Sequence, residues 1–234
     1  MLEILRKIIV TGTVTEGWDQ TPAAPGFRGE VLAQEERCRQ CAQCVRACPV
    51  DAIILKDGQI SIDQGACIFC GRCVEVCEAG ALAQSGNDRL ATLSGVLQEK
   101  SAEVLGRSLA LRHVDAGSCN ACDWEMTALS NPVYDLAQYG IQFVASPRHA
   151  DLLMVTGTVT RNLTQALRMT YEATPEPKLV MAVGSCACRG RTFGESYAIR
   201  GGVDALVPVD IYVPGCPPRP QALLYGLLLA LDRL

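Results

Sequence analysis

The sequence lacks any hydrophobic run long enough to cross a bilayer. Its longest apolar run near the C-terminus, Ala222–Leu231, is about half of what a transmembrane helix needs. No stretch gathers lysine, arginine and aromatic side chains, and the net charge is −4, so a nucleic-acid partner is not expected. No charged, apolar and small-residue signal segment opens the sequence either. We therefore expect a chain of the reducing cytosol that does not itself span a membrane.

Cysteine, by contrast, is abundant, with 13 among 234 residues. Eight of them form two copies of the pattern C-x2-C-x2-C-x3-C, and each position of the first copy recurs 29 residues later. Three thiolates at i, i+3 and i+6 can face three corners of an iron–sulfur cube, but they cannot close the fourth. Structural zinc sites are the alternative. They use separated C-x2-C pairs around one ion, and a third cysteine at the next i+3 position has no place in them.

The two copies resemble bacterial-type ferredoxins with two [4Fe-4S] clusters, in which the fourth cysteine of each run ligates the other cluster. The resemblance assigns cluster 1 to Cys38, Cys41, Cys44 and Cys77, and cluster 2 to Cys67, Cys70, Cys73 and Cys48. Pro49 follows the first run, whereas Glu78 occupies the matching place in the second. Because this position is not a ligand, we expect both clusters to form.

The rest of this N-terminal part surrounds the cysteine runs. Residues 1–14 are apolar with a few charges, which predicts one or two amphipathic turns and a strand-like end. This segment would either rest on a membrane-embedded partner or the bilayer surface, or pack on its own domain. Between the runs, residues 52–55 and 60–62 predict a hairpin that shields the clusters from water. We predict a ferredoxin domain over residues 1–82, with an N-terminal arm over residues 1–30.

A linker is predicted over residues 83–106, with helical spacing at 93–105. In residues 107–234, short apolar runs alternate with helical stretches. Strands are expected at 109–114, 141–144, 152–155, 179–183 and 211–213, and helices at about 123–130, 161–173 and 217–232. The predicted fold is an α+β ferredoxin-like two-cluster domain, followed by an α/β domain with a mainly parallel, flavodoxin-like sheet.

Four of the remaining cysteines follow the expected strands of this second domain: Cys119, Cys122, Cys186 and Cys216. Because the loops at the carboxyl ends of strands in an open parallel sheet gather ligands, these four can converge on one site. Four thiolates suit either a [4Fe-4S] cluster or a zinc ion. We interpret the thirteenth cysteine, Cys188, as a buried and inert thiol, with a substitute ligand or a redox-sensitive group as the alternatives.

Four segments of the second domain carry a resemblance to a known family: HVDAGSCNACDWEM, SPRHADLLMVTGTVTRN, AVGSCACRG and VPGCPPRP. They resemble the small subunit of group 4, energy-converting [NiFe] hydrogenases, including those of formate hydrogenlyases, and more distantly the 20 kDa subunit of respiratory complex I. The resemblance covers about residues 108–234. It implies that Cys119, Cys122, Cys186 and Cys216 bind the proximal [4Fe-4S] cluster, here cluster 3. Residues 1–82 resemble the ferredoxin subunit of the same complexes, which indicates a fusion of two usually separate subunits.

The resemblance implies an electron-transfer subunit of an oxidoreductase, with three [4Fe-4S] clusters and with no NAD, flavin or nickel on this chain. The nickel–iron site would lie on a partner large subunit, because nothing here supplies the paired C-x2-C motifs of such a centre. Further implied partners are membrane-embedded complex I-like subunits and a donor module such as formate dehydrogenase or ferredoxin. The chain would be peripheral, at the cytoplasmic side of the cell membrane.

Two other functions compete with this hypothesis. One is the equivalent subunit of a complex I-like, quinone-reducing assembly, whose first ligand position carries two adjacent cysteines. This chain has the C-x2-C spacing of hydrogenases there, at Cys119 and Cys122. The other is a non-redox, metal-binding scaffold. GSCACRG lacks the glycine and lysine spacing of a phosphate loop, so no nucleotide site is predicted.

Four charged residues within the family motifs have two interpretations each. Asp123 and Glu125 either relay protons or meet the large subunit, or they are ordinary acids at a helix N-terminus. Arg148 and His149 either place positive charge near the reduced proximal cluster, or form a turn whose cation pairs with Asp151. None of these is assigned as a ligand.

Overall fold

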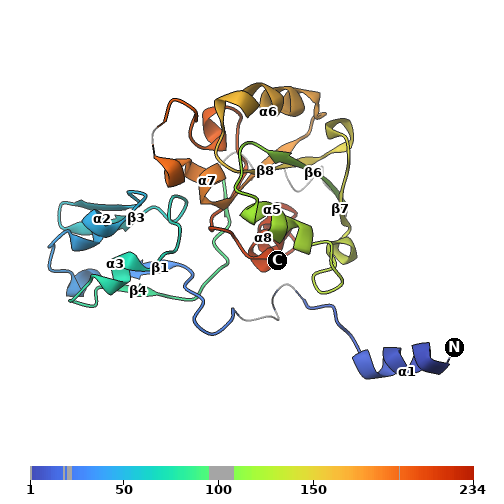
Figure 1. Ribbon diagram of the computed structural model, residues 1–234, viewed down its shortest axis with the longest axis horizontal. Helices are drawn as coiled ribbons and strands as arrows, with labels where there is room; N and C mark the ends of the chain where they lie inside the picture. The colour runs from blue at the N-terminus through green and yellow to red at the C-terminus, as the bar shows by residue number, and fades with distance from the viewer. Residues whose placement is uncertain (1, 18, 20–22, 95–107, 195) are drawn as a thin grey trace.

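Two small sheets and one large sheet organise the chain, which a computed structural model describes over residues 2–17, 19, 23–94, 108–194 and 196–234. Figure 1 shows the cysteine-rich part beside a larger C-terminal part, with helix α1 (Leu2–Thr11) standing away from both. The strand-like end predicted for the first segment is wrong, because the helix continues to Thr11. Leucine, glutamate, arginine and lysine in this segment favour a helix. No residue of α1 is buried.

Antiparallel pairs of strands enclose the cysteine-rich part. Strand β1 (Val31–Ala33) pairs with β4 (Leu82–Gln84), and β2 (Ile53–Lys56) pairs with β3 (Gln59–Ile62). The two central residues of the β2–β3 turn, Asp57 and Gly58, both have positive φ, as a type I′ hairpin requires. Between the strands lie the 3-10 turn η1 (Glu35–Arg37) and the short helices α2 (Gln43–Ala47) and α3 (Arg72–Glu75).

The large sheet has the order β5-β10-β9-β8-β6-β7. Five strands are parallel: β6 (Leu109–Asp115), β7 (Ile141–Phe143), β8 (Leu152–Thr156), β9 (Leu179–Val183) and β10 (Ile211–Val213). Their order in space is 2-1-3-4-5, the order of flavodoxin-like sheets. The mainly parallel sheet predicted from the sequence is thus confirmed. An antiparallel edge strand, β5 (Thr92–Leu93), pairs with β10.

Helices cover both faces of this sheet, as the full burial of β8 and β9 requires. One core lies under α5 (Ala121–Ala128) and α8 (Pro220–Ala230). The other lies under α6 (Arg161–Ala173) and α7 (Gly184–Arg189). The 3-10 turns η3 (Leu136–Tyr139), η4 (Pro147–His149), η5 (Arg191–Phe193) and η6 (Val203–Ala205) occupy connections between these elements. No helix among the described residues has the length and apolar character needed to cross a membrane.

Three differences from the sequence predictions concern short segments. The helix expected from residue 217 begins at Pro220, because Pro217 and Pro218 belong to the loop that carries Cys216. Helix α7 was not expected. The predicted linker contains two stretches of strand: the last residues of β4 (Leu82–Gln84) and the whole of β5 (Thr92–Leu93). The helix expected at 93–105 lies almost entirely outside the described residues.

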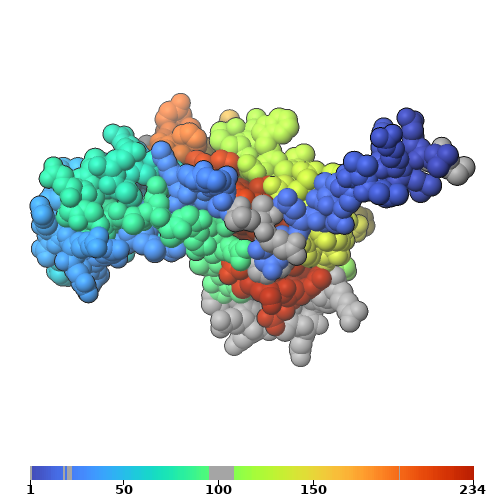
Figure 2. Space-filling model, turned by 90° about the horizontal axis from the view of Figure 1, so that it is seen from below, coloured from blue at the N-terminus to red at the C-terminus, as the bar shows by residue number. Residues whose placement is uncertain are grey.

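Polar contacts join the two parts of the chain. Arg189 Nε lies 3.2 Å from Asp63 Oδ2, and Arg219 Nη1 lies 2.6 Å from Asp88 Oδ2. The Ser185 hydroxyl donates a hydrogen bond of 2.6 Å to the carbonyl oxygen of Cys67. Seen from below, the N-terminal and C-terminal parts pack side by side (Figure 2). The cysteine-rich part is therefore held against the carboxyl edge of the large sheet.

Candidate iron–sulfur sites

The cysteines of the two N-terminal runs lie in two groups around separate cavities. Cys38, Cys41, Cys44 and Cys77 line one cavity, together with Leu55 and Ile60 of the hairpin. Cys48, Cys67, Cys70 and Cys73 line the other, together with Val31 and Ile53. The fourth cysteine of each run therefore lies with the first three of the other run. These are the two ligand sets that the ferredoxin resemblance assigns.

The neighbours that shift the pKa values of the thiols show the same grouping. Burial, together with the neighbouring Cys67, Cys70 and Cys48, raises the pKa of Cys73 to about 11. Burial also raises the pKa of Cys44, and its cysteine neighbours are Cys77 and Cys38. No thiol of one group is a cause of the shift in the other group at these two positions.

The backbone repeats in the same way as the sequence. Gln40 and Phe69, 29 residues apart, both have positive φ, as do Ala42 and Gly71. Such left-handed residues turn the chain sharply between cysteines. Backbone N–H groups point at sulfur in both copies: Gln40 and Ala52 donate to Cys38 and Cys48 (3.4 and 3.2 Å), while Phe69 and Ala81 donate to Cys67 and Cys77 (3.3 and 3.2 Å). Hydrogen bonds of this kind stabilise the negative sulfur ligands of iron–sulfur clusters.

The four cysteines of the second domain meet at the carboxyl edge of the parallel strands. Cys119 lies in the loop after β6 and Cys122 in the first turn of α5, whereas Cys186 follows β9 and Cys216 follows β10. Burial raises the pKa of Cys122, and the neighbouring Cys186, Cys216 and Cys119 add to the shift. All four predicted cysteines are thus brought together by three loops.

Gly184 permits this approach. Its φ is +86°, and a Cβ at this position would lie 2.6 Å from Cys122 Sγ. A larger residue would therefore collide with a candidate ligand and strain the backbone. The glycine brings the start of α7, and with it Cys186, close to Cys122.

Two further side chains surround this site. The Thr192 hydroxyl is buried without a hydrogen-bond partner at normal distance among the described residues, and its proximity to Cys186 lowers the pKa of that thiol against the larger raising effect of burial. A buried hydroxyl with no other partner suits a cluster-bound thiolate. Cys188 is fully buried in the sheet core, and burial raises its pKa to about 12. These surroundings agree with the prediction that Cys188 is a buried and inert thiol.

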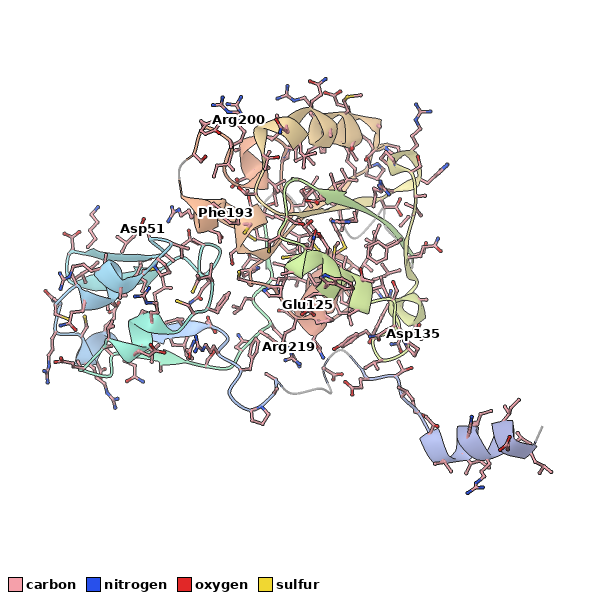
Figure 3. All side chains as sticks on the ribbon, in the orientation of Figure 1. Asp51, Glu125, Asp135, Phe193, Arg200 and Arg219 are labelled. Carbon is pink, nitrogen blue, oxygen red and sulfur yellow. The ribbon has the colours of Figure 1, made fainter. Side chains whose placement is uncertain are left out.

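Asp123 belongs to a hydrogen-bond network that fixes the start of α5. Its Oδ1 accepts from Thr156 Oγ1 (2.7 Å), its Oδ2 accepts from Ser118 Oγ (2.5 Å), and His113 Nε2 lies 3.2 Å away. The network fits the interpretation of Asp123 as an acid at the helix N-terminus, and its role toward protons or the large subunit stays a prediction. Burial raises the pKa of Glu125, and the charge of Arg219 partly opposes this shift. Figure 3 labels Glu125 and Arg219 near each other in the C-terminal part.

The turn expected at Arg148 and His149 is present, but the pairing of its cation with Asp151 and the position near the proximal site are wrong. These residues form η4, which precedes β8, so they lie at the amino edge of the sheet, whereas the four cysteines lie at the carboxyl edge. They cannot set the charge around cluster 3. Among the described residues no ion pair joins Asp151 to Arg148 or His149, and the Asp151 carboxylate instead accepts a hydrogen bond of 2.8 Å from the Ala110 N–H.

The residues present fit iron–sulfur cubes. Each group supplies four thiols, as a [4Fe-4S] cluster requires. Among the described residues, no three cysteine, histidine or acidic side chains converge closely enough to hold a single metal ion. A tetrahedral zinc site needs all four sulfur atoms about 2.3 Å from one ion. No group of the described residues has that arrangement, whereas three groups supply the four thiols that a cube uses.

Comparison with known proteins places both halves of the chain. Residues 119–230 match the family of the NADH ubiquinone oxidoreductase 20 kDa subunit, and residues 30–78 match a 4Fe-4S dicluster domain. The chain is 48% identical over 130 residues to a probable membrane-bound hydrogenase subunit, mbhJ, of Pyrococcus furiosus, covering 56% of this chain and 78% of that protein. The chain belongs to the family of the NADH ubiquinone oxidoreductase 20 kDa subunit, which includes this hydrogenase subunit. The resemblance stated from the sequence motifs is confirmed, and the chain is a subunit of an oxidoreductase complex.

Two further relatives show how far the family extends. Formate hydrogenlyase subunit 7 of Escherichia coli is 40% identical over 148 residues, which are 63% of this chain and 56% of that protein. An NADH-quinone oxidoreductase subunit of Citrifermentans bemidjiense is 49% identical over 113 residues, which are 48% of this chain and 66% of that protein. The family thus includes subunits of hydrogenases and of NADH-quinone oxidoreductases.

Proposed function

We propose that this chain is the electron-transfer subunit of an energy-converting [NiFe] hydrogenase. It would pass electrons between a donor module, such as formate dehydrogenase or ferredoxin, and the nickel–iron site of a partner large subunit. Membrane-embedded partners would couple proton reduction or hydrogen oxidation to ion translocation. The observation that carries the proposal is that twelve cysteines lie in three groups of four on one chain, in a family that includes membrane-bound hydrogenase subunits.

The positions of the two N-terminal cysteine groups relative to the C-terminal part support an order of electron transfer. Bound [4Fe-4S] clusters accept and donate single electrons. The loop of the second run lies against the C-terminal part, where Ile68 and Phe69 line a cavity of about 330 Å³ together with Cys216 and Pro217. The loop of the first run faces outward, and its Cys41 is exposed. This supports an order in which cluster 1 meets the donor, cluster 2 lies between, and cluster 3 faces the large subunit.

The spacing of the first ligands of cluster 3 favours a hydrogenase. The C-x2-C at Cys119 and Cys122 is the hydrogenase spacing in the resemblance, and Cys122 lies in the first turn of helix α5. The quinone-reducing alternative rests on the similarity to the NADH-quinone oxidoreductase relative. Nickel in the purified complex and hydrogen formation would support the first hypothesis, whereas quinone reduction without nickel would transfer the proposal to the second.

We place the chain peripherally at the cytoplasmic side of the cell membrane, and helix α1 supports the peripheral position. Ile4, Leu5, Ile8 and Ile9 share one face at i, i+1, i+4 and i+5, and their side chains are 53–80% exposed. Arg6 lies on the opposite face. An amphipathic helix with a free apolar face can lie in a membrane interface. Both views show it projecting from the body (Figures 1 and 2).

The test of the proposal is the loss of one cluster by mutation. Cys216→Ala in the complex should remove or convert one of three clusters, leave the other two reducible and abolish hydrogen formation. Cys188→Ala is the matched control, because its thiol is buried in the core and should change neither cluster number nor turnover. Iron and sulfide of the unmodified chain should each be about 12, from three cubes of four. Stoichiometric zinc with little iron would refute the proposal.

A further inference from the structure

Ser185 is the direct link between the ligand loops of two different clusters. It precedes Cys186, a candidate ligand of cluster 3, and its hydroxyl oxygen lies 2.6 Å from the carbonyl oxygen of Cys67, a candidate ligand of cluster 2. The residue is 1% exposed. One hydrogen bond therefore joins a ligand of cluster 2 to the neighbour of a ligand of cluster 3.

The same serine is also bound to the third loop of the cluster 3 site. Its backbone N–H donates to the Gly215 carbonyl at 2.8 Å, and Gly215 precedes Cys216. The hydroxyl also lies 3.1 Å from this carbonyl. Because a hydroxyl has one proton to donate, the shorter contact, to the Cys67 carbonyl at 2.6 Å, is the one that takes the proton.

Other contacts join the two parts without touching a ligand. Arg189 pairs with Asp63, and Arg191 Nη1 donates to the Asp51 carbonyl at 3.2 Å. The Arg189 pair is partly exposed, with side-chain exposures of 42% and 25%, and pairs of this kind contribute little to stability. A hydrogen bond made by a buried hydroxyl has no water to replace it, so its loss has the larger effect. The Arg219–Asp88 pair is also partly buried, with side-chain exposures of 20% and 13%, but it does not join two ligand loops. Ser185 is therefore the contact that links the loop of Cys67 directly to the loop of Cys186.

We infer that Ser185 is a positioning residue for electron transfer between cluster 2 and cluster 3. The inference rests on the proposed function. In this step one electron leaves one cube and enters the other, so that the first is oxidised and the second reduced by one electron, with no bond made or broken. The serine fixes the distance across which the electron moves.

The test compares variants of the full chain carrying its clusters. A reductant pulse loads the clusters, and the rate at which cluster 3 becomes reduced is followed together with the magnetic coupling between reduced clusters 2 and 3. Ser185→Ala should slow the transfer and weaken the coupling, because the lost hydrogen bond lowers the ratio of docked to separated ligand loops by about tenfold. Ser185→Thr, which retains a hydroxyl, should restore both. Arg191→Gln is the matched control, because it removes another contact across the junction, and it should change neither.

The outcomes separate this inference from the proposed function. Equal transfer rates in Ser185→Ala and the unmodified chain, with three cubes in each, would overturn the role of Ser185 and leave the proposed function intact. Loss of cluster 3 itself in Ser185→Ala would also overturn it, because the serine would then support its own cluster only. An unmodified chain without cubes would refute the proposed function.

Discussion

Substitution of Thr192 tests whether a buried hydroxyl sets the reduction potential of cluster 3. The hydroxyl has no normal hydrogen-bond partner among the described residues and acts on Cys186. A hydrogen bond to a thiolate ligand stabilises the reduced, more negative state of a cluster. Thr192→Val removes the donor at nearly constant shape, so it should lower the potential of cluster 3 and leave clusters 1 and 2 unchanged.

The size of this shift follows from the energy of one hydrogen bond. We take the bond to be stronger by about 1 kcal/mol in the reduced state, within the range for hydrogen bonds in proteins. Because a tenfold change in equilibrium corresponds to about 59 mV for one electron, the potential should fall by about 40 mV. A redox titration followed by electron paramagnetic resonance measures it. Thr192→Ser keeps the donor and should stay near the original value. An unchanged or raised potential in Thr192→Val would refute the reasoning.

Three further predictions concern other parts of the chain. A fragment of residues 1–85 should fold and bind two cubes, since both N-terminal cysteine groups are complete by Cys77; a single cube by iron analysis would contradict it. Ile8→Glu should abolish binding of the chain to anionic vesicles, whereas Val10→Glu on the charged face of α1 should not. Burial lowers the pKa of His113, so the unfolded chain binds more protons and stability should fall as pH drops below about 6.5; His113→Gln should flatten this dependence of the melting temperature.

The repeated cysteine spacing and the alternation of strands and helices were enough to predict the main features. Strand β9 and helix α6 have the bounds expected from apolar periodicity. The cysteines that follow strands do meet, because parallel strands bring their carboxyl ends to one edge. Both signals are local in sequence and repeat, which is why they can be recognised without a structure.

Other features depend on contacts between distant residues. Arg148 and His149 belong to a family motif, but the direction of β8 takes them to the edge opposite the cysteines. Strand β5 exists because it pairs with the edge of β10, and two residues carry no periodicity. The bond between Ser185 and Cys67 spans 118 positions. A serine before a cysteine gives no signal of it in the sequence.

The two runs have the same cysteine spacing, but the residues between their first two cysteines differ. This difference orients the ferredoxin part. Arg39 and Gln40 of the first run are exposed, whereas Ile68 and Phe69 at the matching places of the second are half-buried at the junction with the C-terminal part. An apolar loop gains free energy by docking, and a charged loop does not. The repeat therefore turns the cysteines that we propose for cluster 2 toward those that we propose for cluster 3. Because both parts share one chain, their effective concentration is high, so this apolar loop together with the hydrogen bond of Ser185 is enough to keep them docked.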